Sequence, residues 1–319
     1  MSFSHRLSSL HRPLLLFSAA MALLACVAAV GLVVDERVLA GAPVWAKPFK
    51  FATSFIAYCL SLAWMLSLLP GLRRTGWWAG TVVAVACAVE MAIITFQAAR
   101  GERSHFNQGT PFDSALYDAM AGTVVVLWAA TLVIAVLLFR ARLADRASAW
   151  AIRLGAVLAL AGAGLGFRMS RPAPEQVPGV SEVVGAHSVG VPDGGPGMPL
   201  TGWSTTGGDL RIPHFVGMHA LQLLPLFLLV LLALAPRFVL LRDARVRLRL
   251  VLVASAAHAA VFALVTWQAL RGQPLVHPDG MTLTAAGVIA LLTAAGGWMA
   301  LRTPARCPRP TPARLERVT

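Results

Sequence analysis

Residues 213–236 read PHFVGMHALQLLPLFLLVLLALAP, an apolar run of 24 residues that contains no Asp, Glu, Lys or Arg. As an α-helix this run would be about 36 Å long at about 1.5 Å per residue, enough to cross a bilayer core of about 30 Å. Lipid offers the backbone no hydrogen-bond partners, and a helix satisfies its backbone internally. The stretch therefore predicts a transmembrane helix.

Further apolar segments of this kind occur along the chain. The predicted helices cover residues 13–34, 48–70, 77–99, 115–139, 149–168, 213–236, 248–270 and 281–301. Composition agrees, because the 319 residues are 57% hydrophobic and 13% charged, whereas soluble domains carry about 25% charged residues. We expect an all-α, polytopic membrane helical bundle of about eight transmembrane helices over residues 1–302, with the lipid bilayer as its partner. Residues 303–319 are expected to form a disordered cytoplasmic tail.

The distribution of Lys and Arg predicts the orientation of this bundle. Eighteen of these residues fall on the side of the N-terminus and nine on the other, which together make the 27 of the chain. Basic residues favour the cytoplasmic side of a membrane, so both termini are expected in the cytoplasm. The loop 169–212 is then extracytoplasmic. The same rule accounts for the net charge of +13, and no nucleic-acid partner is expected.

The first apolar run has an alternative interpretation as a signal peptide. It begins after a basic segment and contains Cys26, but it continues to Val34. A cleaved signal has a shorter apolar region of about 7–15 residues. The length therefore favours a retained first helix.

Two predicted helices end in similar segments. Residues 97–101 read QAARG and residues 268–272 read QALRG, and each is followed by a His and then by a Pro and an Asp before the next helix. These segments end the third and the seventh predicted helix. The pattern predicts a possible 4+4 internal repeat whose halves share one orientation, a parallel repeat.

Polar residues gather at the predicted outer ends of the helices. The candidate catalytic residues are His105, His214, His219 and Asp209, and the candidate substrate-binding residues are Lys47, Lys50, Arg100, Asn107, Arg211 and Gln222. We expect an outward-facing site beneath the loop 169–212, where the histidines act as acid/base residues and Asp209 orients one of them. The basic side chains would bind an anionic or carbonyl-bearing small molecule of unknown identity.

A metal or haem site is the alternative use of these histidines. His105, His214 and His219 supply the three nitrogen ligands typical of catalytic zinc, but His214 and His219 are five residues apart and do not share one face of a regular helix. Haem needs two histidines at similar depth. The cofactor therefore stays unknown at this point.

Two ionisable residues lie deep in the predicted helices, Glu90 and His258. Such residues are costly in a membrane and are commonly functional. They could form a proton relay, or an ion pair inside the bundle. Gly162, Gly164 and Gly166 are expected to allow close packing of the fifth helix.

Three motifs are specific enough to suggest relatives. They are WAKPFKF at residues 45–51, QAARGERSHFN at residues 97–107 and GGDLRIPHFVGMH at residues 207–219. In these motifs the chain resembles a family of uncharacterised bacterial multi-pass membrane proteins. The resemblance covers most of the chain and implies a bacterial membrane protein, but it implies no particular activity.

Three classes of function remain open. The outward cluster favours a membrane-embedded enzyme or a metal/redox protein. Glu90 and His258 keep a proton-coupled small-molecule transporter as an alternative, although a transporter needs polar groups through both halves of the membrane. A membrane scaffold without chemistry would need none of these residues.

Overall fold

The computed structural model describes residues 10–69, 73–143, 145–177 and 179–302. Within these residues eight helices are long and apolar enough to cross a membrane, which confirms the predicted all-α bundle and an integral, multi-pass membrane protein. The predicted tail, 303–319, lies outside the described residues. The long helices are α2 Arg12–Val34, α3 Ala46–Ser67, α4 Arg73–Arg100, α5 Pro111–Arg140, α6 Arg146–Gly164, α8 Arg211–Leu234, α9 Ala244–Leu270 and α10 Gly280–Leu301.

Most of these helices begin before the apolar run that predicted them. α5 begins at Pro111 because the side chain of Thr110 accepts a hydrogen bond from the backbone of its first turn. Asp145, Asp243 and Asp279 cap α6, α9 and α10 in the same way. A capping side chain satisfies backbone N–H groups that would otherwise lack partners. Polar caps therefore extend the helices beyond the hydrocarbon-matching segment.

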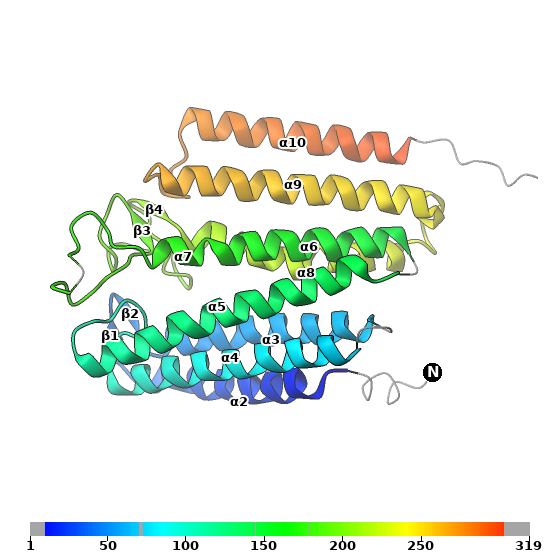
Figure 1. Ribbon diagram of the computed structural model, residues 1–319. Coiled ribbons are helices and arrows are strands. Elements are labelled where there is room, and N and C mark those ends of the chain that lie inside the picture. Colours follow the sequence, from blue (N-terminus) through cyan, green and yellow to red (C-terminus); the bar gives the residue numbers. More distant parts are fainter. Residues whose placement is uncertain (1–9, 70–72, 144, 178, 303–319) are drawn as a thin grey trace, which may run out of the picture.

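The helices pack as two groups of four (Figure 1). In the N-terminal bundle, α2 packs on α3 and α4, α3 packs on α4, and α4 packs on α5. In the C-terminal bundle, α6 packs on α8 and α9, α8 packs on α9, and α9 packs on α10. The order of packing is thus the same in both bundles. They meet where α5 contacts α6 and where α3 contacts α8.

The backbones of α6 and α8 approach each other closely. A Cβ atom on Gly162 would lie 2.6 Å from the Cα of Gly217, and one on Gly217 would lie 2.5 Å from the Cα of Gly162. Two glycines are therefore required where the backbones touch. The expected role in close packing holds for Gly162 but not for Gly164, whose nearest neighbour would be Trp128 at 4.0 Å.

The long connections lie at one end of the molecule, called here the loop end; α2 begins and α10 ends at the opposite tail end (Figure 1). Strands β1 (Val38–Leu39) and β2 (Ala42–Pro43) pair between α2 and α3. The loop 169–212 contains β3 (Ser188–Val189), which pairs antiparallel with β4 (Gly208–Asp209).

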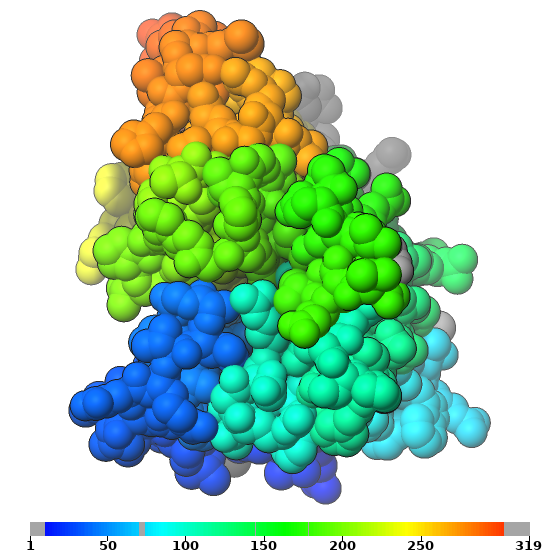
Figure 2. Space-filling view, turned by 90° about the vertical axis from the view of Figure 1, so that its left-hand side faces the viewer, coloured from blue at the N-terminus to red at the C-terminus, as the bar shows by residue number. Residues whose placement is uncertain are grey.

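Two short helices complete the fold. The one-turn helix α7 (Gly166–Met169) continues from α6 at the loop end, and the 3₁₀ helix η1 (Val239–Arg242) connects α8 to α9. Figure 2 views the loop end and shows the green loop between the blue-to-teal N-terminal bundle and the orange connection to α10. The loop therefore covers the region where the two bundles meet.

Candidate functional site

Lys47 and His105 meet at the loop end of the N-terminal bundle. The Nζ atom of Lys47, in the first turn of α3, lies 3.0 Å from Nδ1 of His105, which belongs to the connection between α4 and α5. The ring of Phe51 lies 5.9 Å from the ammonium group and 5.8 Å from the imidazole. Burial and the charge of Lys47 hold the pKa of His105 well below its usual value. The two side chains are therefore in hydrogen-bond contact at a place where burial disfavours a positive charge on His105.

The ring of Phe106 packs against the rings of two histidines, His105 and His187. The φ of Phe106, +63°, lies in the left-handed region, which costs a non-glycine residue about 1–2 kcal/mol. Its ring lies 4.9 Å from that of His187 and 6.1 Å from that of His105. The ring also occupies the space where a side chain at Gly185 would lie. Packing therefore offsets the backbone strain and fixes the two histidines near each other.

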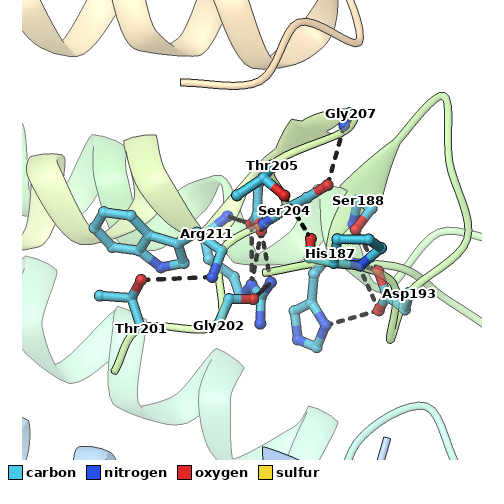
Figure 3. Close-up of polar contacts among 12 residues, drawn as sticks. His187, Ser188, Asp193, Thr201, Gly202, Ser204, Thr205, Gly207 and Arg211 are labelled. Carbon is cyan, nitrogen blue, oxygen red and sulfur yellow. Dashed lines mark hydrogen bonds and ion pairs between the residues drawn. The ribbon is translucent and has the colours of Figure 1, made fainter. Parts of the chain in front are cut away.

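His187 forms a pair with Asp193. Its Nδ1 lies 2.8 Å from Oδ2 of Asp193, and the same carboxylate accepts hydrogen bonds from the backbone N–H groups of His187 and Ser188 (Figure 3). These hydrogen bonds hold the pKa of Asp193 well below its usual value, although burial opposes them. Burial also lowers the pKa of His187. When Nδ1 donates its hydrogen to the carboxylate, Nε2 remains as a base.

Asp209 does not orient a histidine. Its fully buried carboxylate accepts hydrogen bonds from Nε and Nη2 of Arg211 at 2.9 and 2.6 Å, and from the backbone N–H of Ser204. It therefore shapes the loop and neutralises Arg211. The Asp that contacts a histidine is instead Asp193, whose partner is His187, and sequence reasoning missed this pair. A His and an Asp six residues apart in a Gly- and Pro-rich loop carry no periodic signal.

Two basic side chains fasten the loop over this region. Lys50 Nζ donates to the carbonyl of Thr201 at 3.0 Å, and Arg211 Nη2 donates to the carbonyl of Gly202 at 2.7 Å. Both carbonyls belong to the turn 198–203, whose exposed Leu200 lies at the surface. The loop is thus held down by cations from α3 and α8, one from each bundle.

The region carries an excess of positive charge. Lys47 interacts with the charges of Lys50, Arg103 and Arg211. Among the residues that the structure describes, neither Lys47 nor Lys50 forms an ion pair within 4.0 Å. Two lysines without a carboxylate in contact, one of which contacts His105, form an arrangement suited to an anion.

Arg100 and Asn107 have partners in their own segments. Arg100 binds Asp113 at 2.7 Å and Gln97 at 2.5 Å. The side chain of Asn107 donates to the carbonyl of Arg103 and accepts from the backbone of Gly109. These contacts organise the connection between α4 and α5.

Two histidines of the C-terminal bundle, His214 and His258, contact backbone carbonyls. Nδ1 of His214 lies 2.8 Å from the carbonyl of Gly162, and Nε2 of His258 lies 2.9 Å from that of Val216. Nε2 of His219 and Oε1 of Gln222 are buried without a hydrogen-bond partner. Within the described part of the chain, no group of three or more His, Cys, Asp or Glu side chains could hold a metal ion. The geometry gives no support to a site formed by His105, His214 and His219.

Glu90 and His258 belong to different bundles. Glu90, on α4, is 2% exposed and accepts a hydrogen bond from the hydroxyl of Thr123 on α5. No hydrogen bond or ion pair joins it to His258, although the structure describes both residues.

A groove of about 590 Å³ lies elsewhere, on the surface between α4 and α5 towards the tail end. Its lining is apolar apart from Arg74 and Thr75, and it includes Trp78 and Val126. It contains none of the clustered histidines and lysines, so we place the candidate site at the loop end. Comparison with protein-family models, curated proteins and solved structures finds no match to this chain.

Proposed function

We propose that the protein binds an anionic small molecule at its loop end and acts on it with His105 and the His187–Asp193 pair as acid/base residues. The observation that carries this proposal is the pair of lysines without a carboxylate in contact, of which Lys47 contacts His105 and Lys50 contacts the carbonyl of Thr201. A buried positive cluster needs a counter-charge, and an anion from outside supplies one.

The lysines and the histidines would have different roles in the reaction. Lys47 and Lys50 would hold the anionic group and stabilise negative charge that develops during the reaction. Nε2 of His187, positioned by Asp193, would take a proton from water or a hydroxyl nucleophile and return it to the leaving group. His105 would take the second acid/base position, and His214 and His219 are the alternatives to it.

Orientation and duplication belong to the same proposal. We place the loop end on the extracytoplasmic side of a bacterial cytoplasmic membrane, because most Lys and Arg residues fall at the other end. We regard the two bundles as parallel repeats. Supporting this, both pack in the same order, and Gly101 and Gly272 end α4 and α9 with φ of +77° and +72°.

The test is anion binding by the purified protein in lipid nanodiscs. A panel of sulfate, phosphate and carboxylates is expected to raise the unfolding temperature, since a ligand of the folded state stabilises it by mass action. Lys47→Met should abolish the effect, whereas Arg271→Gln, a basic residue of the C-terminal bundle that pairs with Asp279, should retain it. Stabilisation by no member of the panel, or equal loss in both variants, would refute the proposal.

The acid/base assignment has its own test. With a substrate from the panel that turns over, His187→Gln and Asp193→Asn should retain binding and lose turnover. Retained turnover in both variants would remove the pair from the mechanism while leaving anion binding intact.

A proton-coupled transporter is the second candidate, and Glu90 is the observation that favours it. A carboxyl 2% exposed in the middle of a membrane helix is typical of proton-linked transport. Uptake of the bound anion into proteoliposomes, driven by a pH gradient and lost in Glu90→Gln, would support transport. Binding without uptake would exclude it.

A further inference from the structure

The groove between α4 and α5 is formed by small residues that lie between larger ones. The two helices pack side by side (Figure 1), and Ala79 of α4 and Ala130 of α5, each 8% exposed, form its floor. Trp78, Val126 and Val133 line it as well, and their exposed fractions are 56%, 48% and 41%. The groove is therefore an apolar hollow on the surface of the bundle that faces lipid.

The length of the groove matches one leaflet of a bilayer. Arg74, in the first turn of α4, lines it at the tail end, and Val82 lines it eight residues further along the helix. At about 1.5 Å per residue these positions are about 12 Å apart along the helix axis. Half of a hydrocarbon core of about 30 Å is about 15 Å deep. The groove therefore begins near one end of the membrane-spanning segment and stops near its middle.

Two tryptophans mark the level at which the groove begins. Trp77 and Trp78 follow the first turn of α4, their rings lie 4.8 Å apart, and both are exposed. Tryptophan is enriched where the hydrocarbon of a bilayer meets the headgroups. The tail-end mouth of the groove therefore lies at the level of the headgroups.

Two arginines lie at this mouth. Arg74 lines the groove, and Arg140 is the last residue of α5, two heptads beyond the lining residue Val126 and thus on the same face of the helix. A Cβ atom on Gly76 would lie 3.8 Å from Leu137, so the start of α4 and the end of α5 are level with each other. Among the described residues, neither arginine forms an ion pair within 4.0 Å.

We propose that the groove binds one anionic phospholipid, with its phosphate at Arg74 and Arg140 and one acyl chain along the apolar lining. A guanidinium group matches phosphate oxygens with paired hydrogen bonds. Basic pockets between transmembrane helices are a known form of site for anionic headgroups. This lipid site lies at the opposite end of the molecule from the proposed anion site and does not depend on it.

The dimensions favour a lipid over other occupants. A transmembrane helix of a second copy would be about 10–12 Å wide and about 30 Å long, whereas the groove extends through one leaflet only. A free phosphate ion would occupy the arginines and leave the apolar lining around Val82 and Val126 uncovered. A charged head joined to an apolar chain matches both parts of the site.

Titration of the full-length protein with lipid in detergent, followed by native mass spectrometry, tests the headgroup contact. The wild type should bind one phosphatidylglycerol more tightly than phosphatidylcholine with the same acyl chains. The double variant Arg74→Gln/Arg140→Gln should lose about 25-fold in affinity for phosphatidylglycerol, about fivefold for each arginine, which corresponds to about 1 kcal/mol per basic residue. Its affinity for phosphatidylcholine should change little.

Arg237→Gln is the matched control for charge. Arg237 is an exposed arginine that follows α8 at the tail end of the C-terminal bundle, outside the groove. Its loss removes the same charge from the same end of the molecule. It should bind phosphatidylglycerol as the wild type does.

A second pair of variants tests the acyl-chain contact. Ala129 lines the groove and is exposed, so Ala129→Phe fills the groove without disturbing the buried core. It should weaken the binding of both lipids. Ala121→Phe, at an exposed alanine of α5 outside the groove, should bind both as the wild type does.

Several outcomes would overturn the lipid site. Equal affinity of the wild type for the two lipids would do so without any variant, and so would equal losses in Arg237→Gln and the double variant. Undiminished binding in Ala129→Phe would show that no chain lies in the groove. Displacement of phosphatidylglycerol by inorganic phosphate would assign the arginines to a free anion, and a lipid-free dimer that Ala129→Phe dissociates would assign the groove to a second copy.

Discussion

Substitution of Gly162 by alanine tests the contact that holds α6 against α8. The new Cβ would lie 2.6 Å from two backbone atoms of Gly217 and from the backbone nitrogen of Met218. None of these atoms can rotate away as the end of a flexible side chain can. The helices must therefore separate by about 1 Å to restore an ordinary contact, and overpacking of this kind costs about 1–3 kcal/mol.

A second loss follows from the same displacement. The carbonyl of Gly162 lies 2.8 Å from Nδ1 of His214, and a hydrogen bond of this kind contributes about 0.5–1.5 kcal/mol. Alanine recovers up to about 1 kcal/mol through its better helix propensity. The expected net loss in the free energy of unfolding is therefore about 2–3 kcal/mol.

Unfolding in detergent micelles, followed by circular dichroism, measures this quantity. Gly287→Ala is the matched control, because its Cβ would meet no atom within 4 Å, and it should be neutral or slightly stabilising. Gly217→Ala should resemble Gly162→Ala. If Gly162→Ala and Gly287→Ala unfold alike, the close approach of α6 and α8 described above is wrong.

Three further predictions concern the loop end. Asp113→Asn should lower the free energy of unfolding by roughly 2 kcal/mol, because its 4%-exposed side chain accepts charged hydrogen bonds; Asp279→Asn, at a 36%-exposed carboxylate, should unfold much as the wild type does. Burial lowers the folded-state pKa of His187, so its contribution to stability is complete above the unfolded pKa of about 6.5 and declines as the pH falls below that value. The protection of the Ser188 amide, that is, its exchange rate relative to the unfolded chain at the same pH, should fall accordingly. Unchanged protection would contradict the burial of this imidazole. Lys50→Gln and Arg211→Gln should speed proteolysis of the turn 198–203, because each removes a donor to that turn; Arg271→Gln should not, and equal rates in all three would show that the turn is held by other contacts.

The transmembrane helices were predictable because a segment that crosses lipid must be a long apolar helix. Long apolar runs are visible directly in the sequence. Helix ends were less predictable, since residues such as Thr110 and Asp145 extend a helix by capping it and contribute nothing to hydropathy. The predicted helix 149–168 is divided near Leu165, where α6 gives way to the short α7. A local change in backbone hydrogen bonding leaves no mark on an apolar pattern.

The site was predictable only in part. Lys47 and His105 lie at the ends of adjacent helices, so the topology alone brings them to a similar depth in the membrane. The structure places them in contact. The pairing of His187 with Asp193 depends on the path of a loop, which helix periodicity does not describe. Glu90 was identified by its depth, but its contact with Thr123 depends on how α4 and α5 rotate about their axes, and that rotation is set by packing.

The seam between the two bundles has a mechanical consequence. The side chains at the loop end come from both sides of it, with Lys47 and Lys50 on α3 and Arg211 at the start of α8. A small tilt of one bundle against the other would change the spacing of these cations while each bundle keeps its own packing. Bilayer thickness and lateral pressure act on the outer surfaces of both bundles, so the surrounding lipid would tune the affinity of the site from a distance.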